Sequence, residues 1–176
     1  VKYRPVESLL KSETSENDMV LEVLDEIWQK PKGDVLVFVP GEREIKDLSD
    51  IIKKYNPRFE VCSLFSRLPS AEQDKIFEPH TSRRVILSTN LAETSLTVPD
   101  VRYVIDLGLA RISRYSHRSK VQKLPVEEIS RASADQRKGR CGRLADGICF
   151  RLFSEENFDL YEVDVGYEKK SAKEEI

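Results

Sequence analysis

The stretch DVLVFVPG, residues 34–41, decides the fold. It is a continuous apolar run that Pro40 and Gly41 bring to an end, and such a run is typical of a parallel strand buried on both faces. The residues before it, ENDMVLEVLDEIWQK at 16–30, carry apolar side chains at helical spacing, and so does EREIKDLSDIIKKY at 42–55. A buried strand between two amphipathic helices indicates an α/β domain.

The same alternation continues along the chain. Further strands are predicted at FEVCSLF (59–65), RRVILST (83–89), VRYVID (101–106) and GICFRLF (147–153), with helices at SAEQDKIF (70–77) and SRASADQRKGRCGR (130–143). We therefore expect a doubly wound, mainly parallel sheet with flanking helices, and a β-hairpin excursion over the basic residues 111–130. The expected organisation is a strand or linker and first helix at 1–34, a core at 35–153, and a tail or truncated continuation at 154–176.

Composition narrows the class of protein. The chain has 176 residues, 39% hydrophobic and 34% charged, which favours one soluble globular domain. No apolar run is long enough to span a bilayer and no leader opens the chain, so the expectation is a cytoplasmic protein without a membrane partner. The three cysteines form no CxxC pair and the two histidines are isolated, so we expect neither a metal site nor disulfides.

Charge is distributed unevenly. Residues 102–143 are rich in Lys and Arg, whereas residues 155–176 are rich in Asp and Glu. The basic segment is suited to a polyanion such as nucleic acid, although solvated surface alone also explains such a run.

Two strand ends carry unusual polar residues, at the edge of a parallel sheet where ligands usually bind. Gly41 allows a backbone or a phosphate to approach closely, or it simply makes a turn. The segment STNLAETSLTVPD, residues 88–100, includes Thr89, Asn90 and Ser95. Hydroxyl and amide groups suit the backbone of a nucleic acid, and helix capping explains only one or two of them.

We expect a third ligand-facing segment of the same kind at SADQRKGRCGR, residues 133–143. If the helix continues through it, Gln136, Arg140 and Arg143 lie on one face while Arg137 points elsewhere. Glycine costs about 1 kcal/mol inside a helix, and like charges one turn apart repel. Because guanidinium groups match phosphate oxygens, a phosphate-bearing ligand would compensate both costs.

These segments resemble a known family. LVFVPGEREI, SLFSRLPSAEQDKIF, STNLAETSLTVPDVRYVID and SRASADQRKGRCGR are similar, in this order, to the motifs of the second RecA-like lobe of DEAH-box RNA helicases of superfamily 2. The resemblance covers about residues 35–153, and ARISRYSHRSKVQ with the cysteine in GRCGR is most like the bacterial HrpA-type members.

The resemblance implies a site for ATP shared with the first lobe. Gln136, Arg140 and Arg143 would face the triphosphate, with an arginine-finger role for Arg140 or Arg143. Phe77 would stack on adenine, although a core phenylalanine is the plain alternative. Ser95 matches a serine that senses the nucleotide state.

The resemblance also implies contacts with RNA. Gly41, Thr89 and Asn90 match positions that hold the RNA backbone, and Arg114 and Arg118 lie in the basic hairpin that separates or guides strands. The expected partners are single-stranded RNA, or a duplex with an overhang, and the first RecA-like lobe of the same polypeptide.

Two features depart from a complete helicase. Many eukaryotic members have Asp where this chain has Pro99, so a ribose or metal contact there is in doubt, and Asp100 need not replace it. The sequence has no GxxxxGK[ST] loop and no DEAH motif, so we expect ATP with Mg²⁺ bound mainly by the first lobe and no hydrolysis by this chain alone. A non-catalytic nucleic-acid-binding module and a DNA translocase lobe remain alternatives.

Overall fold

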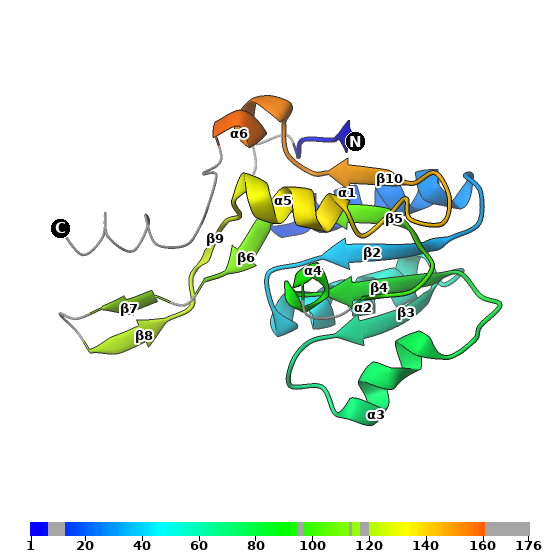
Figure 1. Cartoon of the computed structure of the whole chain (residues 1–176), viewed down its shortest axis with the longest axis horizontal. Coiled ribbons are helices and arrows are strands. Elements are labelled where there is room, and N and C mark those ends of the chain that lie inside the picture. The colour runs from blue at the N-terminus through cyan, green and yellow to red at the C-terminus, as the bar shows by residue number, and fades with distance from the viewer. Residues whose placement is uncertain (7–12, 95–96, 113, 117–119, 161–176) are drawn as a thin grey trace.

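The computed structural model describes residues 1–6, 13–94, 97–112, 114–116 and 120–160. Its centre is a six-stranded sheet in the order β1-β10-β5-β2-β4-β3, and every neighbouring pair is parallel (Figure 1). The strands are β1 (Lys2–Tyr3), β2 (Asp34–Phe38), β3 (Glu60–Leu64), β4 (Arg84–Ser88), β5 (Val101–Asp106) and β10 (Ile148–Arg151). The predicted doubly wound α/β fold is confirmed.

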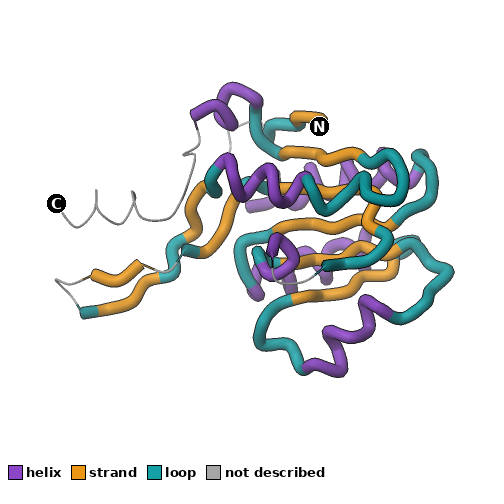
Figure 2. The backbone as a smooth tube through the Cα atoms, viewed as in Figure 1, coloured by secondary structure: helices purple, strands orange, loops and turns teal. Residues whose placement is uncertain are grey.

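Helices cover both faces of the sheet (Figure 2). The long helices α1 (Glu13–Trp28) and α2 (Glu42–Tyr55) pack on one face, where Val35 and Val37 of β2 join their core. The alternate β2 residues Leu36 and Phe38 point into the core on the other face. That face carries α3 (Ser70–Gln73), the 3₁₀ helix η2 (Asp74–Phe77), α4 (Leu91–Thr94) and α5 (Arg131–Lys138). The last described helix is α6 (Glu155–Leu160).

The basic excursion is a pair of antiparallel ribbons. β6 (Leu109–Arg111) pairs with β9 (Val126–Glu128), and beyond them β7 (Arg114–Ser116) pairs with β8 (Val121–Lys123). In Figure 1 the β7–β8 end projects away from the sheet. The predicted β-hairpin is confirmed.

Two local predictions are wrong. The helix predicted through residue 143 ends at Lys138, with Gly139 as its C-cap. Gly142 has φ +77°, a left-handed conformation that cannot continue an α-helix and that glycine adopts without strain. The predicted helix at 70–77 is divided into α3 and η2.

Candidate functional site

The ends of the parallel strands form two opposite sides of the sheet, which we call its edges, and the two edges carry different polar residues. All six strands run the same way, so their carboxyl ends share one edge and their amino ends share the opposite edge. In Figure 1 the arrowheads mark the carboxyl-end edge, on the side from which the hairpin β7–β8 projects. The residues predicted to bind ligands are divided between these two edges.

The carboxyl-end edge carries the neutral polar residues. Gly41 is the N-cap of α2 and follows Val39 and Pro40 at the end of β2, Thr89 directly follows β4, and Asn90 precedes α4. Thr89 Oγ1 accepts from the backbone N–H of Leu91 at 3.5 Å, and the Asn90 carbonyl accepts from the N–H of Glu93 at 3.0 Å. Asn90 is exposed, so its amide group faces solvent beside a partly buried Thr89. This edge can offer hydrogen bonds to a phosphodiester backbone without a net charge.

Arg111, at the end of β6, is a further cation at this edge, and it was not among the residues predicted to bind a ligand. A Cβ atom on Gly41 would lie 2.8 Å from Arg111 Nε, so the glycine leaves room for this guanidinium. Arg111 Nη2 lies 2.6 Å from Glu44 Oε1, and Nη1 donates to the Leu124 carbonyl at 3.1 Å. The close approach expected at Gly41 is therefore made in this structure by a side chain of the same chain.

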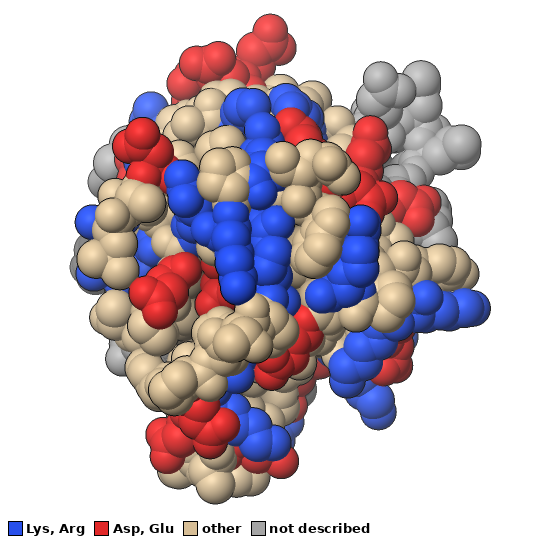
Figure 3. All heavy atoms as spheres, turned by 90° about the vertical axis from the view of Figure 1, so that its right-hand side faces the viewer, with Lys and Arg blue, Asp and Glu red and all other residues tan. Residues whose placement is uncertain are grey.

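The amino-end edge holds the two arginines predicted to face ATP. A cavity of about 430 Å³ lies there, lined by the loops before β2 and β5 and by the turn after α5. Arg140 and Arg143 both line it, together with Lys32 and Arg102. Asp100 is the one carboxylate among the described residues that line it. Figure 3 looks onto this edge and shows Lys and Arg side chains gathered in its middle.

The four cations are held by neutral groups. Each of them donates to a main-chain carbonyl oxygen: Lys32 Nζ to Thr81 at 2.6 Å, Arg102 Nε to Asp146 at 3.0 Å, Arg140 Nε to Gln136 at 3.3 Å and Arg143 Nε to Gly139 at 3.3 Å. Among the described residues, none of the four forms an ion pair with a carboxylate. Since carbonyl oxygens orient these groups without neutralising them, the cavity is suited to an anion.

Phe77 lies on an adjoining cavity of about 470 Å³ at the same edge. The two cavities share Lys32, Gly33, Pro99 and Asp100, so they form one groove, which we call the amino-edge groove. The Phe77 side chain is 49% exposed, whereas its neighbour Ile76 is 2% exposed and fills the core. The alternative that Phe77 is a core residue is therefore wrong.

Asp100 occupies the middle of the groove with an unusual backbone. It is exposed, lines both cavities and has φ +59°. A left-handed conformation is uncommon outside glycine, although Asp and Asn tolerate it better than other residues. Pro99 beside it supplies no carboxylate, so Asp100 is the acid that this turn presents to the groove.

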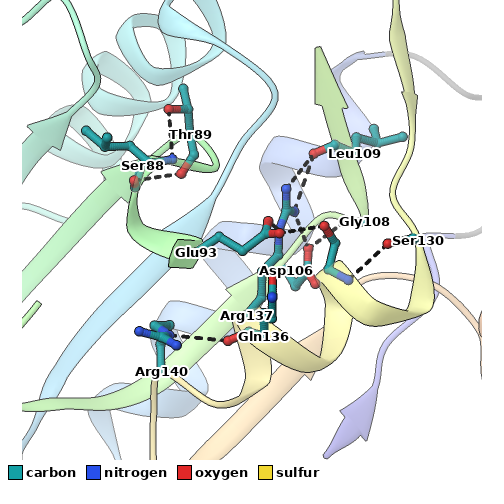
Figure 4. A network of polar contacts seen from close by, with 12 residues as sticks. Ser88, Thr89, Glu93, Asp106, Gly108, Leu109, Ser130, Gln136, Arg137 and Arg140 are labelled. Carbon is teal, nitrogen blue, oxygen red and sulfur yellow. Dashed lines mark hydrogen bonds and ion pairs between the residues drawn. The ribbon is translucent and has the colours of Figure 1, made fainter. Parts of the chain in front are cut away.

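At the carboxyl ends of the strands, α5 is anchored by a fully buried arginine, Arg137 (Figure 4). Arg137 Nε lies 3.0 Å from Glu93 Oε2, and Nη1 lies 2.8 Å from Asp106 Oδ1. Its guanidinium also lies 4.8 Å from the centre of the Phe38 ring. Burial lowers the pKa of Arg137, but the charges of Asp106 and Glu93 raise it by more, so the pKa lies above its ordinary value and the side chain stays charged.

The same network fixes α5 to α4 and to the end of β5. Glu93 belongs to α4, directly after Asn90, and its Oε1 accepts from Ser133 Oγ at 2.5 Å. Arg137 belongs to the last turn of α5, directly before the turn that carries Arg140. The helical register predicted Arg137 to lie away from the ligand-facing side, but it gave no role for this side chain. The hydrogen bonds of Figure 4 show that it links α4, α5 and the end of β5.

Several predicted positions differ from expectation. Gln136, Arg140 and Arg143 were expected at a carboxyl end of the sheet, but α5 begins near that edge and the chain reaches the opposite edge before Arg140. Gln136 is exposed on α5 and is not among the lining residues of the groove. Ser95 and Arg118 lie outside the described residues. Arg114 is described only through the backbone of β7.

The described residues lack two features. They contain no group of three or more His, Cys, Asp or Glu side chains that can hold a metal ion. None of their helices is both long and apolar enough to cross a membrane.

Known proteins with similar sequences point to one family. The chain matches the family described as Helicase conserved C-terminal domain over residues 16–145. It is 53% identical over 160 residues to ATP-dependent RNA helicase HrpA of Escherichia coli (strain K12), covering 90% of this chain and 12% of that protein. It is 40% identical over 173 residues to Probable ATP-dependent RNA helicase DHX34 of Homo sapiens, covering 92% of this chain and 15% of that protein.

A solved structure gives the same answer for the fold. The crystal structure of the E. coli DExH-box NTPase HrpB matches with a TM-score of 0.80 and 30% identity, over 93% of this chain and 20% of that chain. This agrees with the RecA-like sheet expected from the motifs. The chain spans only a small part of the length of each of these relatives.

Proposed function

We propose that this chain, which belongs to the family of helicase C-terminal domains in its DEAH-box branch, works as the second motor lobe of an ATP-dependent RNA helicase. The observation that carries the proposal is the set of four cations in the amino-edge groove, none of which forms an ion pair with a carboxylate among the described residues. Such a cluster needs a polyanion from outside the lobe, and a triphosphate held by a first lobe is one.

The groove supports one orientation of the nucleotide. Arg140 and Arg143 line one end of the groove and the exposed ring of Phe77 lines the other. The triphosphate would therefore lie against the arginines and the base against Phe77, with Asp100 and Lys32 between them. The described contacts of the two arginines use only Nε, which leaves their terminal nitrogens for phosphate oxygens.

The chemistry assigned to the arginines is electrostatic. A guanidinium aimed at the transferring phosphoryl group stabilises the negative charge that develops there and raises the rate about 10³- to 10⁵-fold. The sequence has neither a GxxxxGK[ST] loop nor a DEAH motif, so we assign the Mg²⁺ ligands to the first lobe and propose that this chain alone does not hydrolyse ATP.

RNA is assigned to the carboxyl-end edge. Thr89 and Asn90 offer neutral donors there, Gly41 permits close approach, and Arg111 adds a positive charge that can exchange Glu44 for a phosphate. The hairpin that carries Arg114 and Arg118 projects from the same side (Figure 1). The network of Arg137 then gives a physical link by which a shift of α5 on ATP binding reaches α4 and Asn90.

The test is ATP turnover by the full-length protein, with and without single-stranded RNA, for the native sequence, Arg143→Ala and the control Lys53→Ala. Lys53 is an exposed cation on α2, on the other face of the sheet. We expect RNA-stimulated turnover that Arg143→Ala lowers by about 10³-fold while RNA affinity changes by less than about threefold. Lys53→Ala should leave both unchanged.

The alternatives predict different results. Salt-sensitive RNA binding without any turnover by the full-length protein would favour a non-catalytic binding module. Equal or greater stimulation by single-stranded DNA would favour a DNA translocase.

A further inference from the structure

Phe77 is presented to the amino-edge groove by a tightly held turn. It is the last residue of η2, and it is 49% exposed. An exposed aromatic ring on a short 3₁₀ helix loses little by moving, because few packing contacts restrain it. Its position therefore depends on whatever fixes the backbone on either side of it.

One restraint is Arg84, the first residue of β4. Its Nη1 donates to the carbonyl of Lys75 at 3.0 Å and lies 3.3 Å from the carbonyl of Glu78. The Arg84 side chain is 6% exposed, so these contacts are protected from water. They hold η2 from the side of the sheet.

The second restraint is His80, just beyond the turn. Its Nε2 lies 2.8 Å from Oδ2 of the buried Asp34, and its Nδ1 lies 3.2 Å from the carbonyl oxygen of Glu78. Asp34 is itself fixed at the start of β2, where its Oδ1 accepts from the backbone N–H of Arg84 at 3.0 Å. His80 thus connects the sheet to the residue that follows Phe77.

Both ring nitrogens of His80 face oxygen acceptors. A neutral imidazole has one donor and one acceptor nitrogen, whereas the protonated ring has two donors. Only the protonated ring can donate to both Asp34 and Glu78, and the neutral ring must lose one of the two bonds. Because both nitrogens are occupied, the ring has none left for a ligand in the groove.

We propose that His80, anchored by Asp34, is a positioning residue that holds Phe77 in place for the nucleotide base, and that this hold weakens when His80 loses its proton. The inference rests on the proposed nucleotide contact of Phe77. The charged groups around His80 come from several elements: Asp34 of β2, Glu60 of β3, Arg84 of β4, Lys32 and Asp100 of the groove, and Glu78 of its own loop.

The first test is the pH dependence of the KM for ATP. The full-length protein is assayed at saturating RNA from about pH 5 to about pH 8, the range in which an unperturbed histidine side chain changes charge. We expect the KM of the native protein to rise about three- to tenfold as pH rises, the value of one hydrogen bond, while kcat shows no matching change. His80→Gln keeps one donor at every pH, so it should remove this component and leave only the pH dependence of ATP itself.

The second test asks whether His80 acts through Phe77. KM is measured for His80→Ala, Phe77→Leu and the double variant at the low-pH end of the same range. His80→Ala should raise KM about three- to tenfold in the native background and have no further effect when Phe77 is already leucine.

Each result decides between two claims. If Phe77→Leu leaves KM unchanged, the proposed base contact fails and the inference fails with it. If Phe77→Leu raises KM but His80→Ala does not, or if their effects add fully, the base contact stands and the positioning role is wrong. Should His80→Ala not fold, as judged by thermal unfolding, the pH profile of His80→Gln decides alone: a slope equal to the native one overturns the proposal.

Discussion

The two edges of the sheet differ in how their positive charges are balanced. At the carboxyl-end edge, the cation Arg111 is paired with Glu44 at 2.6 Å, and the polar residues Thr89 and Asn90 are neutral. At the amino-end edge, four cations line one cavity, and each donates to a carbonyl oxygen without an ion pair to any carboxylate among the described residues. An edge that balances its own charge can bind and release a long polymer, whereas an unbalanced one is suited to a compact anion brought by a partner.

The comparison also explains the glycines of the GRCGR turn. Gly139 ends α5, and Gly142 reverses the chain in a left-handed conformation, so Arg140 and Arg143 are carried on a turn instead of a helix face. The turn places both guanidinium groups on the same cavity. The backbone conformation of this turn therefore determines where the positive charges of Arg140 and Arg143 lie.

The largest expected effect comes from breaking the buried network of Arg137 at the carboxyl-end edge. Arg137→Met leaves Glu93 and Asp106, which are 7% and 0% exposed, without their common partner. Removing one member of a buried charge network costs about 3–5 kcal/mol. We expect a loss of this size in the free energy of unfolding, measured by urea denaturation of this chain and followed by the fluorescence of its single tryptophan, Trp28.

Lys138 provides the matched control for this prediction. It is the next residue, is exposed, and makes only a 4.0 Å pair with Asp135. Lys138→Met should change stability by less than about 1 kcal/mol. A loss below about 1 kcal/mol for Arg137→Met as well would mean that the buried network of Arg137 does not stabilise the fold.

An intermediate effect is expected from the two glycines of the amino-end turn. Gly142→Ala forces a side chain into φ +77°, which costs about 1–2 kcal/mol even though the nearest atom to the new Cβ is 3.8 Å away. Gly139 has φ −65°, and a Cβ there lies 3.4 Å from the Gln136 carbonyl. Gly139→Ala should therefore be neutral or stabilise by up to about 1 kcal/mol.

The same pair of variants tests the role of the turn in activity. Strain relieved by a backbone shift at residue 142 displaces Arg143, so ATP turnover of the full-length protein should fall for Gly142→Ala and persist for Gly139→Ala. Equal turnover and equal unfolding curves for both variants would show that the left-handed turn does not set the position of Arg143.

Much of the fold was predictable because its signals are local. The all-buried strand β2 and the amphipathic helix α2 follow from apolar spacing within a few residues. Tyr55 is the last apolar residue in the helical spacing of residues 42–55, yet it is 65% exposed, because α2 ends at this residue and extends beyond the core. Periodicity thus indicates a face but not how far the core extends along it.

The site was less predictable because its contacts join distant parts of the chain. Arg137 meets Glu93 and Asp106 across 44 and 31 residues, and no local pattern reveals such a pairing. Lys32 and Arg102 were missed for the same reason, since they reach the groove from the loop before β2 and from the start of β5, both far from Arg140 in sequence. The edge assigned to Arg140 and Arg143 was wrong because spacing predicts a helix but not where the chain emerges after crossing a sheet.

The smallest expected effect separates the edges by the ligand that each one binds. Arg111 is partly exposed and its pair with Glu44 lies at the surface, so Arg111→Ala should change the free energy of unfolding by less than about 1 kcal/mol. If Arg111 exchanges Glu44 for an RNA phosphate, its loss should reduce the slope of log affinity against log salt by about 0.7, the value for one contact with a single strand. Fluorescence anisotropy with a labelled single-stranded RNA over a salt series measures this slope.

Arg102 is the matching cation at the other edge. Arg102→Ala should leave the salt dependence of RNA binding unchanged and raise the KM for ATP, whereas Arg111→Ala should leave the KM for ATP measured without RNA unchanged. The two cations differ in what balances them, since Arg111 has a carboxylate partner and Arg102 Nε has only the Asp146 carbonyl. Should both variants lower the salt slope equally, RNA would contact both edges, and the electrostatic difference between them would not assign separate ligands.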